Sequence, residues 1–551
     1  MRQRVLQPFR DDSDVRRWAS PVTREAVLAA VVGALVSAAL VWLGPPGADL
    51  AAHLYQRTLF IEHGYALWNN FWYAGRYSFV TYSVLYYPLA AVFGIRALAV
   101  ATVTVGAAAF AVLVGREWGP AVRWSSRTFA LAWASVVLTG EFPFALGITF
   151  ALLALCALQA GGRISFAVLV LLTAATSPLA LLLLLVVFAA IAVERRRNDP
   201  RFRERALVVL AVCVAEFVLW RAFPSGGRYP FSFPEAAAAF TFCLIGLGVT
   251  WRVEAARLLR YVFLVYLAAC AVIFAIPSSV GEDIARFRLV AIPIAVLALS
   301  LRSWRPRPVV FVALALAISW NVSSLAATVA KSADDPAANA AYWQPAVDYL
   351  KTHLTPSYRV EAVDTAGHWP AVYLARASIP LARGWFRQND FPLNRVLYKN
   401  LGRDNYLQWL RSLGIRYVVL SSASPDYSAR MEERLIQSGR SGLRLVFHTA
   451  DISIYEVPLA RAIVVGPGQP RVVDLETSRL ELSLDRAGTY RVAVSYSPYW
   501  AATSGCVSES PDGMVQLRVA RPGRVWLRFV VKAETALDTV AGIEPGCSVS
   551  R

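Results

Sequence analysis

The sequence predicts an α-helical polytopic membrane domain of about eleven transmembrane helices, then an extracytoplasmic α/β domain and a small β-sandwich. Hydrophobic residues make up 57% of the 551 residues, charged residues only 17%, and the mean hydropathy is +0.46. A soluble protein of this length is less apolar. The long apolar runs end near residue 330. The first lysine of the chain is Lys331, and polar residues become frequent after it. A soluble part therefore follows the membrane part.

The membrane domain is predicted at 25–330, after a cytoplasmic segment at 1–24. Apolar runs that approach the ~20 residues of a membrane span occur at 25–44, 95–115, 127–140, 142–160, 206–223, 234–250, 257–276, 288–301 and 309–329. The run 164–193 contains Pro178, which removes a backbone donor and disfavours helix at Ser177. We expect two short helices there, which brings the count to eleven. The first run lacks a convincing cleavage site and is interpreted as an uncleaved span.

The arginines predict how the chain crosses the plasma membrane. The net charge is +18, but the basic residues fall in short clusters between apolar runs. This placement is typical of orientation signals, so no nucleic-acid partner is expected. With the N-terminus in the cytoplasm, the inner loops hold most of the arginines of the first 330 residues. The loops 45–94, 224–233 and 277–287 and everything after residue 330 then lie outside.

Two outer domains are predicted from their hydrophobic patterns. Between 331 and 460, helix-like segments such as "YWQPAVDYLKTHL" alternate with β-branched runs such as "IRYVVLSS", which is typical of an α/β unit. From 461 to 551 the pattern has a period of two, with Gly and Pro between the runs, which indicates an antiparallel β-sandwich. Cys506 and Cys547 lie in this last domain and could pair if it faces an oxidising compartment.

Asp49 and His53 are the candidate catalytic pair. Their i, i+4 spacing places them on one face of a helix at the start of the first outer loop. Together they could hold a divalent cation such as Mg²⁺ or Mn²⁺, or the aspartate could orient the imidazole as a general base. Glu62 and His63 could contribute after a turn at Gly64, or simply end a helix. Asp49 alone could equally be a helix N-cap.

The rest of this loop is rich in aromatic, amide and arginine side chains. An interfacial aromatic belt explains several of the aromatics but does not explain the polar residues among them. Carbohydrate sites combine apolar walls with a few fixed polar groups, so the loop is a candidate substrate site. The candidate residues are Trp68, Asn69, Trp72, Tyr73, Arg76, Tyr82 and Tyr86.

Further polar residues stand at the predicted outer boundary. Glu141 lies between two apolar runs, where a carboxylate is costly unless it is paired or functional, although a loop acid facing water is an equal alternative. Arg286 and Arg288 begin the span 288–301 and, with Arg228 in another outer loop, are candidates to bind a lipid-linked phosphate. Ion pairing of Arg286 or Arg288 with Glu282 or Asp283 is an equal alternative.

The α/β region carries its own mixed group of residues. The segments "TAGHWPAVY" and "RGWFRQND" could form an acceptor platform, although aromatic anchors of an α/β core would have the same pattern. The residues concerned are His368, Trp369, Trp385, Arg387 and Asp390.

Several of these stretches resemble one family of bacterial membrane proteins. Asp49-x-x-x-His53, Gly64, Trp68 and "YSVLYYPLAAVFG" are similar to the first outer loop of proteins described as "6-pyruvoyl-tetrahydropterin synthase-related". The stretch "ARGWFRQNDFPLNRVLY" resembles the soluble domain of actinobacterial relatives. The stretch "YSPYWAATSGCVSESPDGMVQLRV" resembles the C-terminal module of YfhO-like proteins. These proteins are similar in architecture to GT-C glycosyltransferases.

The resemblance implies a chemistry. GT-C enzymes place one or two acidic residues in the first outer loop, as a base or metal ligands, and take sugar from a polyprenyl-phosphate donor. It implies Asp49 as the leading carboxylate with His53 beside it. A second acid of the common two-acid motif is missing here, or is supplied by Glu62 or Glu141, which puts metal dependence in question.

The sequence therefore predicts inverting glycosyl transfer on the outer face. Its expected partners are a polyprenyl-phosphate-linked sugar, a cell-envelope glycan or lipid acceptor, and membrane lipids. A lipid or glycan flippase is the first alternative, although the midplane polar site and inverted repeats of many transporters are not visible. The second alternative is a catalytically silent scaffold that binds cell-envelope glycans.

Overall fold

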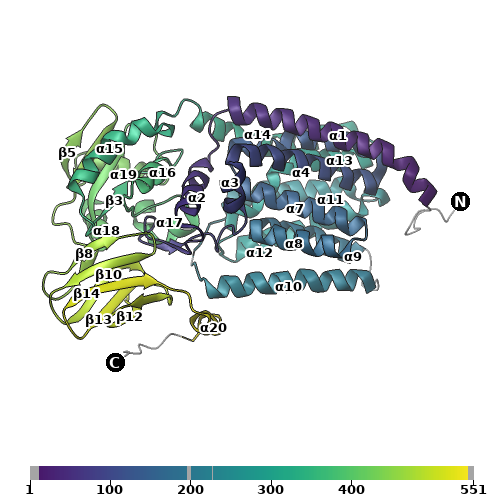
Figure 1. Cartoon of the computed structure of the whole chain (residues 1–551). Coiled ribbons are helices and arrows are strands. Elements are labelled where there is room, and N and C mark those ends of the chain that lie inside the picture. The colour runs from purple at the N-terminus through teal and green to yellow at the C-terminus, as the bar shows by residue number, and fades with distance from the viewer. Residues whose placement is uncertain (1–11, 195–199, 226, 544–551) are drawn as a thin grey trace. The chain divides into compact units, whose positions relative to one another are not determined.

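The computed structural model describes residues 12–194, 200–225 and 227–543 as two compact units (Figure 1). The first unit contains 1–47, 92–214 and 230–330, and the second contains 48–91, 215–229 and 331–551. The helices of the first unit lie side by side. They are α1 (Asp12–Leu43), α4 (Ile95–Trp118), α5 (Arg123–Trp133), α6 (Val136–Thr139), α7 (Phe142–Gln159), α8 (Arg163–Thr176), α9 (Pro178–Glu194), α11 (Phe233–Thr250), α12 (Arg257–Ala275), α13 (Ala291–Leu301) and α14 (Arg307–Ser332). The helix α10 (Pro200–Ala222) begins in the first unit and ends in the second.

Within the described residues, seven helical stretches are long and apolar enough to cross a membrane. The chain is a membrane protein with a helical N-terminal part, but the predicted count of eleven spans is not confirmed. One stretch, Ile95–Thr139, runs through two of the predicted spans, and α8 and α9 have only 14 and 17 residues. The predicted break between α8 and α9 is confirmed. Ser177 is extended, with φ −159° and ψ 112°, as expected before proline.

Small residues allow close helix packing in the first unit. A Cβ added at Gly147 of α7 would lie 2.7 Å from the Cβ of Ala180 on α9. A Cβ at Gly33 of α1 would lie 3.2 Å from Ala107 of α4. Because lipid is as apolar as leucine, close backbone approach through small residues is a main source of helix association in membranes.

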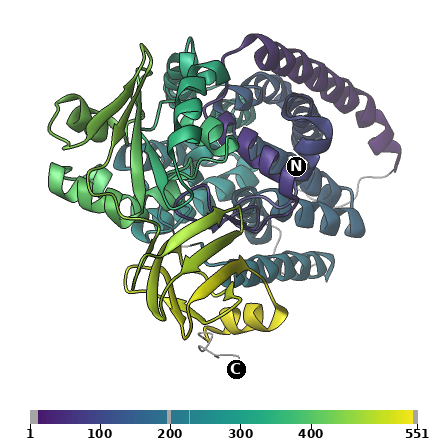
Figure 2. The same cartoon turned by 60° about the vertical axis from the view of Figure 1, so that its left-hand side comes forward.

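The second unit contains the strand-rich C-terminal part (Figure 2). A mixed sheet of order β3-β4-β6-β5 is formed by β3 (Arg359–Ala362), β4 (Ile415–Ser421), β5 (Arg444–His448) and β6 (Ile452–Glu456). Its helices are α15 (Ala340–His353), α16 (Pro370–Arg376), α17 (Arg387–Leu393), α18 (Arg403–Ser412) and α19 (Arg430–Gln437). These strands and the three longer helices lie where the hydrophobic pattern predicts them.

The β-sandwich consists of two antiparallel four-stranded sheets, ordered β12-β13-β10-β7 and β11-β14-β9-β8. Its strands are β7 (Val464–Val465), β8 (Arg471–Leu475), β9 (Arg479–Leu484), β10 (Gly488–Ser495), β11 (Trp500–Ala502), β12 (Cys506–Glu509), β13 (Met514–Val519) and β14 (Gly523–Phe529), followed by α20 (Ala533–Ala541). Cys506 takes part in a disulfide. Its predicted partner, Cys547, lies outside the described residues.

The first outer loop belongs to the second unit. It contains α2 (Leu50–His63), the short hairpin of β1 (Trp68–Asn69) and β2 (Arg76–Tyr77), and α3 (Tyr86–Phe93). The backbone oxygen of Phe71 accepts a hydrogen bond of 2.9 Å from the amide of Leu381 in the α/β domain. The amide of Asn70 donates to the oxygen of Thr477 in the sandwich, also at 2.9 Å. The loop is therefore built into both C-terminal domains.

Candidate functional site

Asp49 and His53 lie at the start of α2 and share a neighbour, Tyr87. Asp49 is at the N-cap position but its side chain makes no capping hydrogen bond, which removes the simple N-cap interpretation. His53 is fully buried, and its Nδ1 lies 3.2 Å from the hydroxyl of Tyr87. Burial raises the pKa of Tyr87 well above its usual value, with a smaller contribution from the charge of Asp49. An imidazole and a phenol are thus in contact, about one helical turn after Asp49.

Other buried polar groups of the loop have unused donors. Within the part of the chain that the structure describes, Gln56 Nε2, Asn69 Nδ2 and the Tyr86 hydroxyl have no hydrogen-bond partner. All three side chains are almost completely buried, and the Tyr86 ring lies 5.7 Å from the His53 ring. Buried polar groups are rarely left unpaired in native proteins. These donors are suited to a water molecule or a hydroxyl-bearing ligand.

Trp68, Trp72 and Tyr73 are covered by protein. The Trp68 ring stacks on Phe529 of the sandwich at 4.9 Å. The indole of Trp72 donates to the backbone oxygen of Ala371 at 2.9 Å. The hydroxyl of Tyr73 donates to the backbone oxygen of Phe386, also at 2.9 Å. All three are at most 2% exposed, so they fasten the loop to the C-terminal domains and offer no open ring face to a sugar.

Arg76 and Tyr82 both contact Phe386. The guanidinium carbon of Arg76 lies 3.8 Å from the Phe386 ring centroid, and its Nε donates to Asn389 Oδ1 at 3.1 Å. Burial lowers the pKa of Arg76 to about 10. Tyr82 is half-buried and lies between the rings of Phe386, at 5.0 Å, and His53, at 6.1 Å. Tyr82 is therefore the loop aromatic that remains both near His53 and partly accessible.

Glu62 and His63 are the end of a helix. Glu62 is exposed and pairs with His63 at 4.0 Å, and α2 ends at Gly64 with φ +63°. Thirteen residues separate Glu62 from Asp49 along the chain, which in a helix rising ~1.5 Å per residue is about 20 Å. Glu62 is therefore not the second acid of the pair. Among the described residues, no three His, Cys, Asp or Glu side chains are grouped to hold a metal ion.

Glu141 and Arg286 form a second polar cluster, in the first unit. Glu141 is 5% exposed, so it is not a loop acid facing water. Its Oε1 lies 3.4 Å from Arg286 Nε, and Asp283 Oδ1 lies 3.1 Å from Arg286 Nη2. The guanidinium also lies 5.6 Å from the ring of Phe144. The cluster thus has two carboxylates around one buried cation.

Arg288 and Arg228 have other surroundings. Arg288 Nη1 lies 3.8 Å from Glu235 Oε2, which also accepts a hydrogen bond from the Trp320 indole. Arg228 is exposed on the second unit, and its backbone amide donates to Gln388 at 3.0 Å. Arg286 is the better candidate for a phosphate site, because Arg286 lines an apolar cavity and Arg288 does not.

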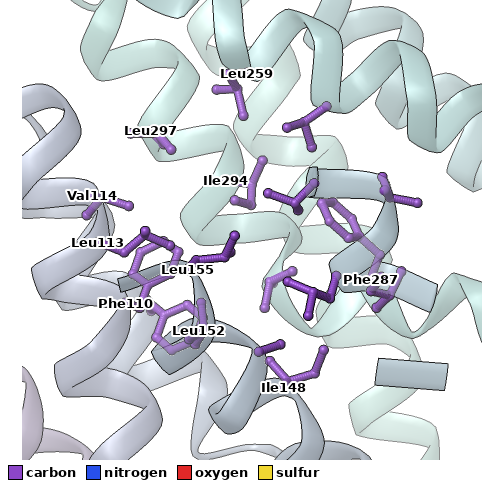
Figure 3. Close-up of a pocket in the computed structure, with 18 of the residues that line it drawn as sticks. Phe110, Leu113, Val114, Ile148, Leu152, Leu155, Leu259, Phe287, Ile294 and Leu297 are labelled. Carbon is purple, nitrogen blue, oxygen red and sulfur yellow. The ribbon is translucent and has the colours of Figure 1, made fainter. Parts of the chain in front are cut away.

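An apolar cavity of about 180 Å³ leads away from Arg286 between the helices (Figure 3). Its wall follows α7 from Phe144, beside Arg286, to Gln159, whose Nε2 donates to Glu117 Oε2 at 3.3 Å. At ~1.5 Å per residue this wall is about 22 Å long, most of the ~30 Å hydrocarbon core of a bilayer. The labelled side chains that point into it are Phe110, Leu113, Val114, Ile148, Leu152, Leu155, Leu259, Phe287, Ile294 and Leu297. The cavity has the shape and polarity to hold a lipid chain.

Sequence reasoning missed several members of these clusters. Tyr87 is one of five tyrosines between 73 and 87, and nothing in the sequence distinguishes it as the partner of His53. Gln56 follows His53 by three residues on the same helix, and this spacing was a usable signal. Asp364 stands four residues before His368, at the same i, i+4 spacing as Asp49 and His53.

No family model and no curated protein match this chain. Among solved structures it is similar to the arabinofuranosyltransferase AftD from Mycobacteria, at 17% identity and a TM-score of 0.49 over 93% of this chain. The match spans 42% of AftD. It is also similar to the oligosaccharyltransferase of Archaeoglobus fulgidus, solved with Zn and sulfate, at 15% identity and a TM-score of 0.38 over 71% of this chain and 68% of that chain. Both are glycosyltransferases by name. Likenesses this distant do not assign an activity to this chain.

Proposed function

We propose that this chain is a membrane glycosyltransferase that transfers a sugar from a polyprenyl-phosphate donor to a cell-envelope acceptor on the outer face. The observation that carries the proposal is the apolar cavity with Arg286 in its wall. Its lining is mostly apolar, and Arg286, Glu117 and Gln159 are the charged and amide side chains in it. A lipid with a long apolar chain and an anionic head fits that distribution, because the chain needs an apolar wall and the phosphate needs a cation.

Arg286 is suited to the departing phosphate. Its contacts with Glu141 and Asp283, 3.4 and 3.1 Å, are longer than the 2.7–2.9 Å of strong charge-assisted hydrogen bonds. The carboxylates thus hold the guanidinium at the wall of the cavity. In the proposed step the acceptor hydroxyl oxygen attacks the anomeric carbon. The bond from that carbon to the phosphate oxygen breaks, and Arg286 stabilises the charge that develops on polyprenyl phosphate.

Asp49 is the proposed base for the acceptor hydroxyl proton. Its carboxylate does not cap α2, and the nearby His53 is oriented by Tyr87. The covalent chain supports its placement near the outer boundary. Gly47, two residues earlier, packs so closely on Gly140 that an added Cβ would lie 2.9 Å from the Gly140 Cα. A base at Asp49 and a cation at Arg286 are the two charges that this reaction needs.

A divalent cation would be held by Asp49 and His53. The pair supplies two ligands, and MgII or MnII sites normally use more oxygen ligands from protein, substrate or water. Since no third carboxylate, imidazole or thiolate among the described residues completes a group, no step of the proposed mechanism is assigned to a metal.

The proposed N-terminus-inside orientation, with both C-terminal domains outside, rests on the arginine distribution.

The test compares Asp49→Asn with a matched control in the same helix, Glu62→Gln. Each variant is expressed in the source strain from which the native chain has been deleted. We expect the deletion and Asp49→Asn to accumulate polyprenyl-phosphate-linked sugar and to lack one sugar in the envelope glycans. Glu62→Gln should behave as the wild type, because its side chain is exposed and about 20 Å from Asp49. Normal glycans with Asp49→Asn would remove the proposed base.

A flippase is the second candidate, favoured by the length of the cavity. Its wall ends at Gln159 and Glu117, near the arginine-rich loop that the orientation rule places inside. A lipid carrier could use such a wall as a path across the membrane. Purified protein in liposomes with fluorescent polyprenyl-phosphate sugar distinguishes the two: transfer without scrambling supports the enzyme, and scrambling without transfer supports the carrier.

A further inference from the structure

The α/β domain presents the carboxyl ends of three parallel backbone segments at one edge. The strands β3 and β4 are parallel neighbours. The segment 380–382 runs parallel to β3 on its other side, with Val360 N donating to Pro380 O at 2.9 Å and Ala382 N donating to Val360 O at 3.0 Å. In sheets with parallel strands, ligands bind outside the carboxyl ends, where the following loops diverge.

Each of these segments is followed by charged or aromatic side chains that contact one another. Asp364 and His368 follow β3, Arg387 follows the segment 380–382, and Asp426 follows β4. His368 Nδ1 lies 2.6 Å from Asp364 Oδ2, and Arg387 Nη2 lies 2.6 Å from Asp426 Oδ1. The amide of Asp426 donates to the backbone oxygen of Asp364 at 2.9 Å, which ties the two acid loops together.

His368 is held in an unusual conformation. Its φ is +59°, in the left-handed region that few residues other than glycine adopt. Its amide donates to Thr365 O at 2.9 Å, and its ring is fixed through Nδ1 by Asp364. An aspartate bound to Nδ1 sets the tautomer and leaves Nε2 to meet a ligand. A strained residue whose side chain is aimed by a carboxylate is a frequent feature of binding sites.

Trp385 differs from the core tryptophans of the same domain. Trp369 is 3% exposed and its indole donates to Asp335 Oδ2 at 3.1 Å. Trp343 is 1% exposed and its indole donates to Ala337 O at 2.8 Å. Trp385 is only half-buried, packs edge-on against His368 at 6.0 Å, and its indole nitrogen has no partner among the described residues. The Trp385 ring is thus not a satisfied core anchor.

A continuous row of rings links this edge to the first outer loop within the second unit. The ring of Phe386 lies 5.3 Å from Trp385 and 5.0 Å from Tyr82, and Tyr82 lies 6.1 Å from His53. The two imidazole and carboxylate pairs therefore stand at the two ends of one aromatic wall. Trp385 and Tyr82 are the rings of this row that a sugar could reach, because Phe386 is 3% exposed and His53 is fully buried.

The charges of the edge favour a neutral, hydroxyl-rich ligand. Arg387 is already paired with Asp426 and bonded to Ser428 Oγ at 2.7 Å. Burial alone would raise the pKa of Asp426, but Arg387 and His368 hold it below its usual value, so it stays ionised. Two carboxylates repel a phosphate or another anion. The carboxylates can accept hydrogen bonds from the hydroxyl groups of a sugar. The imidazole and the indole can donate hydrogen bonds to the same hydroxyl groups.

We propose that the edge formed by Asp364, His368, Trp385 and Asp426 binds the non-reacting part of a neutral oligosaccharide acceptor. That the oligosaccharide is an acceptor rests on the proposed glycosyl transfer. That this edge binds a neutral glycan does not rest on it. The Trp385 indole and the His368 Nε2 contact the sugar, and Asp364 acts as a positioning residue through His368.

The experiment measures sugar binding by the purified full chain in nanodiscs, using saturation-transfer NMR and calorimetry. The probes are linear gluco-, manno-, galacto- and arabino-tetrasaccharides, with sialyl-trisaccharide as an anionic comparison. We expect at least one neutral probe to bind and the anionic one not to bind. Trp385→Ala and His368→Gln should each weaken binding about tenfold, the effect of losing one good polar or stacking contact.

Three controls make the result decisive. His353→Gln, at the exposed end of α15, should bind as the wild type. His448→Gln, on the exposed strand β5, should also bind as the wild type. Trp385→Phe, which keeps the ring and removes only the unpaired N–H, should retain part of the affinity and guards against misfolding of Trp385→Ala. Binding by none of the neutral probes, or equal binding by all variants, would overturn the proposal. If the chain binds a neutral sugar but its deletion changes no envelope glycan, the proposed transfer reaction is overturned and the proposed sugar binding is not.

Discussion

Arg286 in the membrane unit and Arg383 in the α/β domain have similar carboxylate partners but different access. Arg286 faces Glu141 and Asp283, at 3.4 and 3.1 Å, and lines the apolar cavity. Arg383 binds both oxygens of Asp390, at 3.0 and 2.7 Å, and the Ser428 hydroxyl at 2.8 Å. Two more carboxylates, Glu361 and Glu432, stand 4.0 and 3.7 Å from its Nη1.

The difference shows that a buried ion cluster does not by itself mark a functional site. Arg383 is bidentate, 4% exposed and enclosed by the core of its domain. Charged groups that are taken out of water in this way hold each other in place, and removing one partner leaves the others uncompensated. Arg286 has looser contacts and an apolar space beside it. Its surroundings can admit a ligand, which is the property that separates the two clusters.

The largest expected effect is loss of folding when Arg383 is replaced. Arg383→Met keeps most of the volume but leaves Asp390 buried without its counter-ion, at a cost of about 3–5 kcal/mol. Thermal unfolding followed by tryptophan fluorescence, with trypsin digestion of the 331–551 region, measures it. Arg444→Met is the control, because Arg444 pairs with Glu456 on the surface, where such pairs contribute ~1 kcal/mol or less. Equal stability of the two variants would mean that the Arg383 cluster is not structural.

The next effect concerns Arg286, which we expect to matter for the ligand more than for the fold. Arg286→Gln should weaken binding of undecaprenyl phosphate about tenfold or more and lower sugar transfer by about 10²–10³, the usual cost of one transition-state donor. Native mass spectrometry measures the lipid, and glycan analysis measures transfer. Arg288→Gln is the matched control, since Arg288 faces Glu235. An Arg286 variant that unfolds as readily as Arg383→Met would make both clusters structural.

The α/β and sandwich elements were predictable because local patterns determine them. The run "IRYVVLSS" became β4, and the pattern break at Pro178 became the end of α8. Both signals lie within a few residues, where sterics and hydrophobic periodicity act. The count of membrane spans was less predictable. Helices such as α8 and α9 are apolar but short, and their neighbours in the bundle, not their own length, fix their position.

The composition of the sites was only partly predictable. Asp49 and His53 were recognisable because their spacing is helical. The burial of Trp68, Trp72 and Tyr73 was not, because the residues that cover them, such as Phe529 and Phe386, lie more than 300 positions away in the chain. An aromatic residue on a loop has the same sequence signal whether it stacks on a ligand or on a distant domain.

The smallest expected effect is a pH dependence of stability that comes from the Arg383 cluster. Burial raises the pKa of Glu432 from 4.5 to about 7 and also holds the pKa of Glu361 well above its ordinary value, with repulsion from Glu432 adding to the effect on Glu361. Above the ordinary pKa of glutamate, these two carboxyl groups thus keep their protons in the folded domain and lose them in the unfolded chain. The free energy of unfolding should therefore fall as pH rises from about 4.5 to 7, by at most about 1.4 kcal/mol per pH unit for each proton. The groups that face these carboxyls are Arg383, Asp390, Asp364 and Tyr406.

Glu432→Gln tests this dependence directly, because the amide resembles the neutral acid in shape and cannot ionise. Its unfolding temperature should change less between pH 5 and pH 8 than that of the wild type, and it should be the more stable protein at pH 8. Asp404→Asn, on the exposed first turn of α18, should leave the slope unchanged. Below pH 4 the trend should reverse, because Arg383 overcomes the effect of burial and holds the pKa of Asp390 low, so its protonation costs stability. A wild-type protein that gains stability from pH 5 to pH 8 would contradict this prediction. It would show that Glu361 and Glu432 are ionised in the folded domain and that solvent reaches Arg383. The difference in access between Arg383 and Arg286 would then be lost.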